Sequence, residues 1–189
     1  MKQAYVNGVP IPREAVQFEL DRLVKFYASH GVGADEIKAN LEKLLERAQE
    51  QAIGFRLLLD RAAQLEIPVS DAEVDAQIEK IVKEIGGRES FEKALAAQKM
   101  DESHLRKDLE RSCRVDRLVS QACTGVDEPT EEDVAAYYEA HRESFAKDGG
   151  KTIVDVADTI RDLLRHTMRG RAIDAFVAEL RSSAKIEYR

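Results

Sequence analysis

Hydrophobic residues recur at helical spacing through most of this chain, and the run near the C-terminus organises the rest. After Thr152 they return at intervals of three and four residues, which places them on one face of a helix. The positions are Ile153, Val156, Ile160, Leu163, Leu164 and Met168, then Ile173, Phe176, Val177 and Leu180. Charged residues fill most of the opposite face. The pattern predicts a long amphipathic helix.

The period changes at the end of the chain. Lys185 to Arg189 alternates between polar and apolar residues, as an edge strand does. A strand needs a partner, and the similar alternating segment is Ala4 to Asn7 at the other end of the sequence. We therefore predict that the N- and C-terminal strands join in a small two-stranded patch.

Helical periodicity also fills the sequence between these ends. Together with the final helix it predicts about seven helices, and hence a mainly α fold with one helical domain over residues 1–189. The other helices are expected at Arg13 to about Ser29, Ala34 to Leu65, Val74 to Ile85, around Phe91, Asp101 to Ala122, and Thr130 to Phe145.

Three local signals refine this picture. Ser70 and Glu73 match a capping box at the start of a helix, and Thr130 to Asp133 is a weaker cap of the same kind. Gly54 lies inside the second helix, where it indicates a bend or a close contact with another helix.

Composition excludes several classes of protein. The chain has 189 residues, of which 43% are hydrophobic and 34% charged, as in a folded soluble protein. A net charge of −7 argues against nucleic-acid binding, because phosphate contacts need a basic face. No apolar run is long enough to span a membrane. No signal peptide is visible, so we expect the protein to be cytoplasmic or its export signal to be missing from this sequence.

No residues form a recognisable catalytic or metal site. Cys113 and Cys123 would lie roughly 15 Å apart on one helix, too far for a disulfide, so two free thiols are expected. The four histidines do not pair at metal-binding spacing. Gly86-Gly87 lacks the features of a phosphate loop. We expect no catalytic residue, no metal and no cofactor, and an enzyme with an unrecognised site is the least supported alternative.

Six aromatic and methionine positions are candidates for binding a polypeptide. Adjacent helical residues do not share a face, so one member of each aromatic pair points away from the main apolar stripe. The ordinary role of such residues is packing between helices, and the functional alternative is an apolar cleft for an extended segment. The candidates are Phe26, Tyr27, Phe91, Met100, Tyr137 and Tyr138.

Four segments resemble one family. Ala4 to Ile11 is similar to the opening strand of the SurA-like chaperones, and Leu65 to Asp75 to a helix end and the capped helix start after it in those proteins. Pro129 to Phe145 is similar to the segment that leads into their parvulin domain, and Arg171 to Ile186 to the segment on the C-terminal side of that domain. The resemblance covers most of the chain and implies a multi-helix chaperone domain.

The sequence departs from SurA, PrsA and their relatives at the parvulin domain. Between Phe145 and Thr152 there are only residues 146–151, a polar joint with glycines, and no parvulin pattern appears elsewhere. Proline isomerase activity is therefore not carried over from the resemblance.

We predict a non-enzymatic chaperone that binds unfolded or extended polypeptides. The resemblance implies exported or outer-membrane clients and a periplasmic or other extracytoplasmic location, with the cytoplasm as the alternative. The second hypothesis is a structural or assembly module without holdase activity. One form of it is a domain-swapped homodimer, in which the final helix packs on a second chain.

Overall fold

A computed structural model of the chain describes residues 2–147 and 150–189. These residues form two compact units. The first runs up to Leu118 and includes Val177–Arg189, and the second is Val119–Phe176. The predicted joint at residues 146–151 contains Asp148 and Gly149, which lie outside the described residues.

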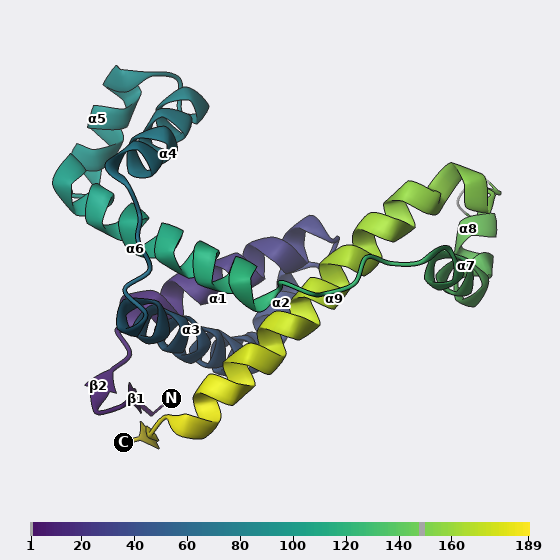
Figure 1. Cartoon of the computed structure of the whole chain (residues 1–189), viewed down its shortest axis with the longest axis horizontal. Coiled ribbons are helices and arrows are strands. Elements are labelled where there is room, and N and C mark those ends of the chain that lie inside the picture. Colours follow the sequence, from purple (N-terminus) through teal and green to yellow (C-terminus); the bar gives the residue numbers. More distant parts are fainter. Residues whose placement is uncertain (1, 148–149) are drawn as a thin grey trace. The chain divides into compact units, whose positions relative to one another are not determined.

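The mainly α fold is confirmed. Over the described ranges there are nine helices and three strands (Figure 1). In chain order they are β1 (Ala4–Val6), β2 (Val9–Pro10), α1 (Arg13–Ser29), α2 (Ala34–Ala39), α3 (Leu41–Gln64), α4 (Asp71–Glu84), α5 (Arg88–Ala97), α6 (Glu102–Ala122), α7 (Glu131–Ala140), α8 (Arg142–Lys147), α9 (Ile153–Ser183) and β3 (Ile186–Tyr188).

Two of the predicted helices are each divided in two. Asn40 separates α2 from α3, and its side-chain amide donates a 2.9 Å hydrogen bond to the carbonyl oxygen of Glu36. A side chain that bonds its own backbone in this way competes with the helix. His141 separates α7 from α8 in a similar position, with its Nδ1 2.8 Å from the carbonyl oxygen of Tyr137.

The pairing of the two chain ends is confirmed. β1 pairs antiparallel with β3, with Val6 opposite Ile186, and both ends of the chain lie at this sheet in Figure 1. The short strand β2 adds a third member, so that the order is β2-β1-β3. Asn7 and Gly8 connect β1 to β2 with φ angles of 50° and 81°, as a tight hairpin turn requires.

The core of the first unit lies between α1, α3 and the sheet. Its buried residues come from β1, from one face of α1 and from one face of α3, and the end of α9 adds partly buried residues. They include Val6, Val16, Leu20, Leu23, Leu44, Ala48, Ala52, Ile53 and Leu57, with Leu180 and Ala184 packed against them. Gly54 makes the predicted close helix contact, because a Cβ added there would lie 3.3 Å from Cγ1 of Val177.

A separate cluster in the same unit joins α4, α5 and α6. Its buried residues are Val74, Ile78, Val82 and Phe91. The predicted capping box at the start of α4 is confirmed, with both reciprocal bonds between Ser70 and Glu73 present. These bonds from Ser70 lower the pKa of Glu73.

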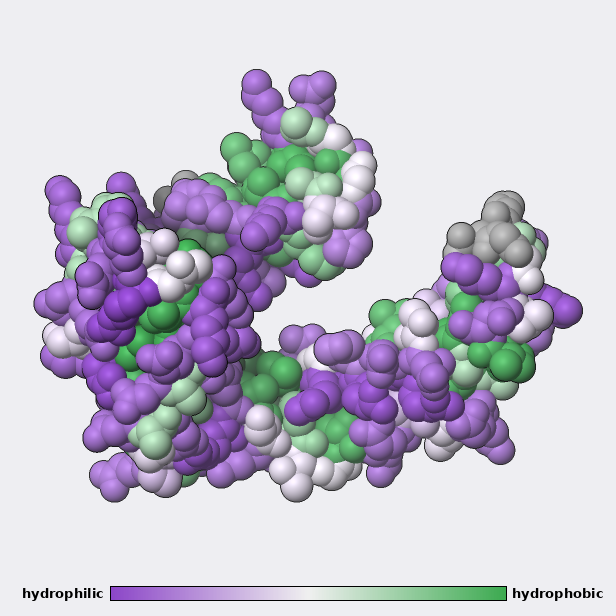
Figure 2. All heavy atoms as spheres, turned by 90° about the horizontal axis from the view of Figure 1, so that it is seen from above, coloured by the Kyte–Doolittle hydropathy of each residue, from purple (hydrophilic) through white to green (hydrophobic). Residues whose placement is uncertain are grey.

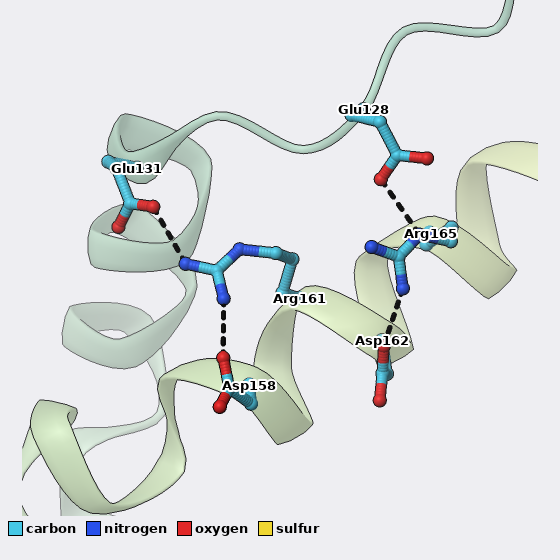
Figure 3. A network of polar contacts seen from close by, with 6 residues as sticks. All are labelled: Glu128, Glu131, Asp158, Arg161, Asp162 and Arg165. Atoms are coloured by element: carbon cyan, nitrogen blue, oxygen red, sulfur yellow. Dashed lines mark hydrogen bonds and ion pairs between the residues drawn. The ribbon is translucent and has the colours of Figure 1, made fainter.

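The second unit has a small core of its own, formed by Val134, Val156 and Ile160. Thr130 and Asp133 make a full capping box at the start of α7. Figure 3 shows two arginines of α9 that connect it to the segment before and within α7. Arg161 bonds Glu131 and Asp158, and Arg165 bonds Glu128 and Asp162.

Every helix in the described part of the chain is too short or too polar to cross a bilayer.

Candidate functional site

Two phenylalanines on α1 are unusually exposed. Phe18 is 62% exposed and Phe26 is 54% exposed. They are eight residues apart, with Arg22 midway, so all three lie on one face of the helix. Val16 and Leu20, on other sides of α1, are buried in the core, which leaves the face with Phe18 and Phe26 towards the outside of the unit.

A matching row lies on α3. Phe55 is 43% exposed, and Arg47, Gln51 and Leu59 are related to it by steps of four residues. Phe55 and Leu59 line a hollow together with Phe18, whereas Arg47 and Gln51 line a hollow together with Phe26. The two helices therefore run antiparallel, with one row facing the other.

The two hollows share Arg22 as a lining residue and lie along the same pair of helices, and together we call them the α1–α3 groove. The Phe18 end has a volume of about 530 Å³, and the Phe26 end about 480 Å³. Arg22 lines both. Eight helical residues span roughly 12 Å at about 1.5 Å each, which is the length of about three to four extended residues. Figure 2 shows one face of the molecule with apolar residues (green) exposed between hydrophilic ones (purple).

The Phe18 end contains charges of both signs. Glu19 is 7% exposed and accepts from Arg22, whose Nη1 lies 2.9 Å from Oε2 of Glu19. Helix α6 contributes Asp108 and Arg111, whose carboxylate and guanidinium are 3.3 Å apart. The carboxylates here already have cationic partners.

The Phe26 end is different, because its lining has three cations and no carboxylate. The lining residues are Arg22, Leu23, Lys25, Phe26, Ser29, Arg47 and Gln51. Nη1 of Arg47 donates a 2.9 Å hydrogen bond to the hydroxyl of Tyr27. A neutral phenol thus holds the guanidinium in place, and Arg47 also lines the hollow beside α2, together with Glu36.

Phe26 is the sequence-predicted candidate that lies in the groove. Its ring centroid is 4.2 Å from that of His30, and Nδ1 of His30 is 2.7 Å from the carbonyl oxygen of Phe26. Tyr27 faces another hollow of about 260 Å³ next to α2, which Val32 and Ile37 also line. The expectation that neighbours on a helix take different faces holds for this pair.

Phe91 and Met100 lie elsewhere in the first unit. Phe91 is 1% exposed in the α4–α5–α6 cluster, and the guanidinium of Arg88 lies 5.0 Å from its ring centroid. A client could reach Phe91 only if these helices separated, because its ring packs between them. Met100 is half-buried, and its backbone N–H donates to the carbonyl oxygen of Leu95 at 3.0 Å.

Tyr137 and Tyr138 belong to the second unit and pack against its core. The ring of Tyr137 stacks on His141 with centroids 4.0 Å apart. Tyr138 stacks on Phe145 at 5.3 Å, and its hydroxyl donates to the carbonyl oxygen of Lys151 at 3.0 Å. Both rings are half-buried, so each still presents an edge to solvent.

Phe18 and Phe55 were not among the sequence-predicted candidates. Phe55 fits the apolar stripe of its helix, so spacing alone assigned it to the core. Phe18 lies off the stripe formed by Val16, Leu20 and Leu23, and this off-face position is the signal that could have identified it.

Other possible chemistry is sparse. Cys113 and Cys123 are free and half-buried, as predicted, and burial raises the pKa of the Cys113 thiol. Within residues 2–147 and 150–189, no group of three or more His, Cys, Asp or Glu side chains is placed to hold a metal ion.

Comparisons with known proteins agree with the resemblance. A family model described as the SurA-like N-terminal domain matches residues 2–119, a range that contains the whole α1–α3 groove. One solved structure comes from work on the virulence factor PEB4 and the periplasmic protein Cj1289, described as two structurally related SurA-like chaperones in the human pathogen Campylobacter jejuni. It matches with a TM-score of 0.56 at 13% identity, over 100% of this chain and 98% of that chain, which shows a shared fold. No curated protein matches the sequence.

Proposed function

The chain belongs to the SurA-like N-terminal domain family, and we propose that it holds unfolded or extended polypeptides in the α1–α3 groove. It is a SurA-like chaperone without a parvulin domain. Its action is binding alone, with no chemical step, and its clients are exported or outer-membrane polypeptides in an extracytoplasmic compartment.

One observation carries this proposal, namely the exposure of three phenylalanines around one groove. Burying a phenylalanine stabilises a protein by about 1.5–3 kcal/mol, yet Phe18, Phe26 and Phe55 remain 43–62% exposed. Apolar side chains that gather on a surface usually mark a binding site. A groove open along its length suits an unfolded segment, which brings apolar side chains at intervals and has no fixed shape.

The test is suppression of aggregation of a chemically unfolded client, measured by light scattering. Wild-type protein should suppress aggregation, whereas the double variant Phe18→Ser/Phe55→Ser should need several times more protein for the same effect. Circular dichroism should show that the variant stays folded with only a small fall in melting temperature, because a large part of each ring is already exposed. Val154→Ser is the matched control, since Val154 is 86% exposed and lies outside the groove.

A proline-isomerisation assay on the same samples should show no acceleration over the uncatalysed rate. Full protection by the double variant would show that clients bind elsewhere. Failure of the wild-type protein to protect any client would contradict the chaperone proposal itself.

A further inference from the structure

The Phe26 end of the groove has a local charge opposite to that of the whole chain. The protein carries a net charge of −7. At this end, however, Arg22, Lys25 and Arg47 lie around one hollow and no acidic side chain lines it. Charges of one sign in a concave site concentrate oppositely charged groups of a ligand.

Two of these cations are available to bind an anion. Arg22 is committed to Glu19 through contacts of 2.9 and 3.2 Å. In the part of the chain that the structure describes, neither Lys25 nor Arg47 forms an ion pair with a carboxylate. Arg47 uses one N–H on Tyr27 and keeps further donors, and a guanidinium suits the two oxygens of a carboxylate.

The ring of Phe26, which is the apolar surface in the same hollow, is also fixed by contacts with its neighbours. Phe26 has its ring against His30, with centroids 4.2 Å apart, and in an edge contact with Tyr27 at 5.5 Å. Tyr27 therefore contacts both the ring of Phe26 and the guanidinium of Arg47. It fixes an apolar surface and a cation side by side.

We propose that the Phe26 end of the α1–α3 groove selects polypeptide segments in which a carboxylate stands next to a large apolar side chain. The apolar side chain packs on Phe26 and the carboxylate is bound by Arg47 and Lys25. The proposal rests on the client-binding function above and adds a preference to it. The carboxylate comes either from an acidic residue within the segment or from the free C-terminus of the client.

The experiment uses the full chain and fluorescently labelled peptides of about eight residues, with binding followed by fluorescence anisotropy. The reference peptide contains Phe followed by Gln and ends in an amide. A second peptide has Glu in place of that Gln, and a third ends in Phe with a free carboxylate. The reference measures apolar binding alone, and the other two separate the sources of the carboxylate.

At least one carboxylate peptide should bind about threefold to tenfold more tightly than the reference at low salt, the range expected for one or two partly exposed ion pairs. This advantage should shrink in about 0.3 M salt because of screening. The variant Lys25→Gln/Arg47→Gln should abolish the advantage and leave the affinity for the reference peptide unchanged. Lys43→Gln is the matched control, because Lys43 lies on α3 but lines the other hollow.

The outcomes separate the two proposals. Preference for one carboxylate peptide over the other supports the inference and identifies the source. Equal affinity for all three peptides overturns the inference while leaving client binding intact, as does an equal loss for all three in the Lys25→Gln/Arg47→Gln variant. No binding of any peptide, together with no protection of clients, overturns both.

Discussion

Two neighbouring side chains on α1, those of Phe26 and Tyr27, have different roles. Phe26 faces the groove and Tyr27 faces the hollow next to α2, although they are neighbours in sequence. The hydroxyl of Tyr27 accepts from Arg47 of α3, so its polar end connects the two helices while its ring supports Phe26. An aromatic residue with a polar end suits this position, because a phenylalanine at residue 27 would leave Arg47 without that acceptor.

Asp101 gives a prediction for acid stability at the start of α6. The backbone N–H of His104 donates to its carboxylate at 2.9 Å. This bond, together with smaller contributions from the side chains of Ser103 and His104, lowers the pKa of Asp101 from 3.8 to about 2. A carboxyl group whose pKa is lower in the folded state stabilises the fold above its unfolded pKa, and the contribution is lost as pH falls through the folded pKa.

We therefore expect the free energy of unfolding to fall between about pH 4 and pH 2, partly because of Asp101. Asp101→Asn keeps an oxygen that can accept from His104 but does not titrate, so its unfolding free energy should change less over this range. Denaturant titrations at several pH values measure the difference. Asp174→Asn, at an exposed position on α9, should follow the wild type, and an identical pH profile for Asp101→Asn would contradict the assignment.

At the scale of elements, spacing predicted most helices because each has one apolar face. The sequence also predicted that the two ends of the chain pair, because segments in which polar and apolar residues alternate occur at both termini. The break at Asn40 escaped prediction, since the apolar period continues across it from Ile37 to Leu41 and Leu44. At the end of α2 the side chain of Asn40 bonds the carbonyl oxygen of Glu36, and apolar periodicity gives no information on such a bond.

The groove was harder to predict than the helices that form it. Phe55 and Phe91 both fit apolar stripes, yet Phe55 is 43% exposed and Phe91 is 1% exposed. The difference arises because Phe91 packs in the cluster of α4, α5 and α6, whereas α1 and α6 only flank the open hollow that Phe55 lines. Which faces remain uncovered depends on how helices distant in sequence pack, and local spacing contains no such information.

Gly54 allows the contact between α3 and the last part of α9 to be tested. A Cβ there would lie 3.3 Å from Cγ1 of Val177, so alanine meets a slightly tight contact. Its gain of about 1 kcal/mol in helix propensity over glycine opposes that strain. Gly54→Ala should thus stay within about 0.5 kcal/mol of wild type, whereas Gly54→Leu should destabilise by about 1–3 kcal/mol through overpacking.

Thermal and denaturant unfolding of both variants measure these values. Val177→Ala should restore part of the stability of Gly54→Leu, because it removes the methyl groups that clash. If Gly54→Leu were as stable as the wild type, the two helices would not be closely packed at this point.

For the whole molecule, the two chain ends close the first unit. Gln3 and Arg189 exchange backbone hydrogen bonds of 2.9 Å in both directions. Tyr188 donates to Glu50 of α3 at 2.7 Å, and Arg181 bonds the same carboxylate at 2.6 Å. The hydroxyl of Tyr188 has a raised pKa because of burial and its bond to Glu50. Residues at both ends of the sequence thus hold one core together.

The sequence predicts one domain, and the structure raises the question of whether its two compact units unfold together. Helices α6 and α9 each continue from one compact unit into the other. The core of the second unit, Val134, Val156 and Ile160, is small, and a core of that size rarely stabilises a fold alone. We propose that the second unit is stable only while α6 and α9 are anchored in the first.

Deleting residues 185–189 tests that dependence. The deletion removes β3 and uncovers Val6, which is 0% exposed, so we expect a loss on the order of 3 kcal/mol from lost burial and hydrogen bonds. Circular dichroism should show one thermal transition, shifted downwards as a whole. Hydrogen exchange should accelerate in α7 of the second unit as well as in α3.

Glu187→Gln, which keeps the backbone hydrogen bonds of β3, should leave both measurements close to wild type. Two transitions, with only one of them shifted, would show that the units unfold independently and that the chain is two domains.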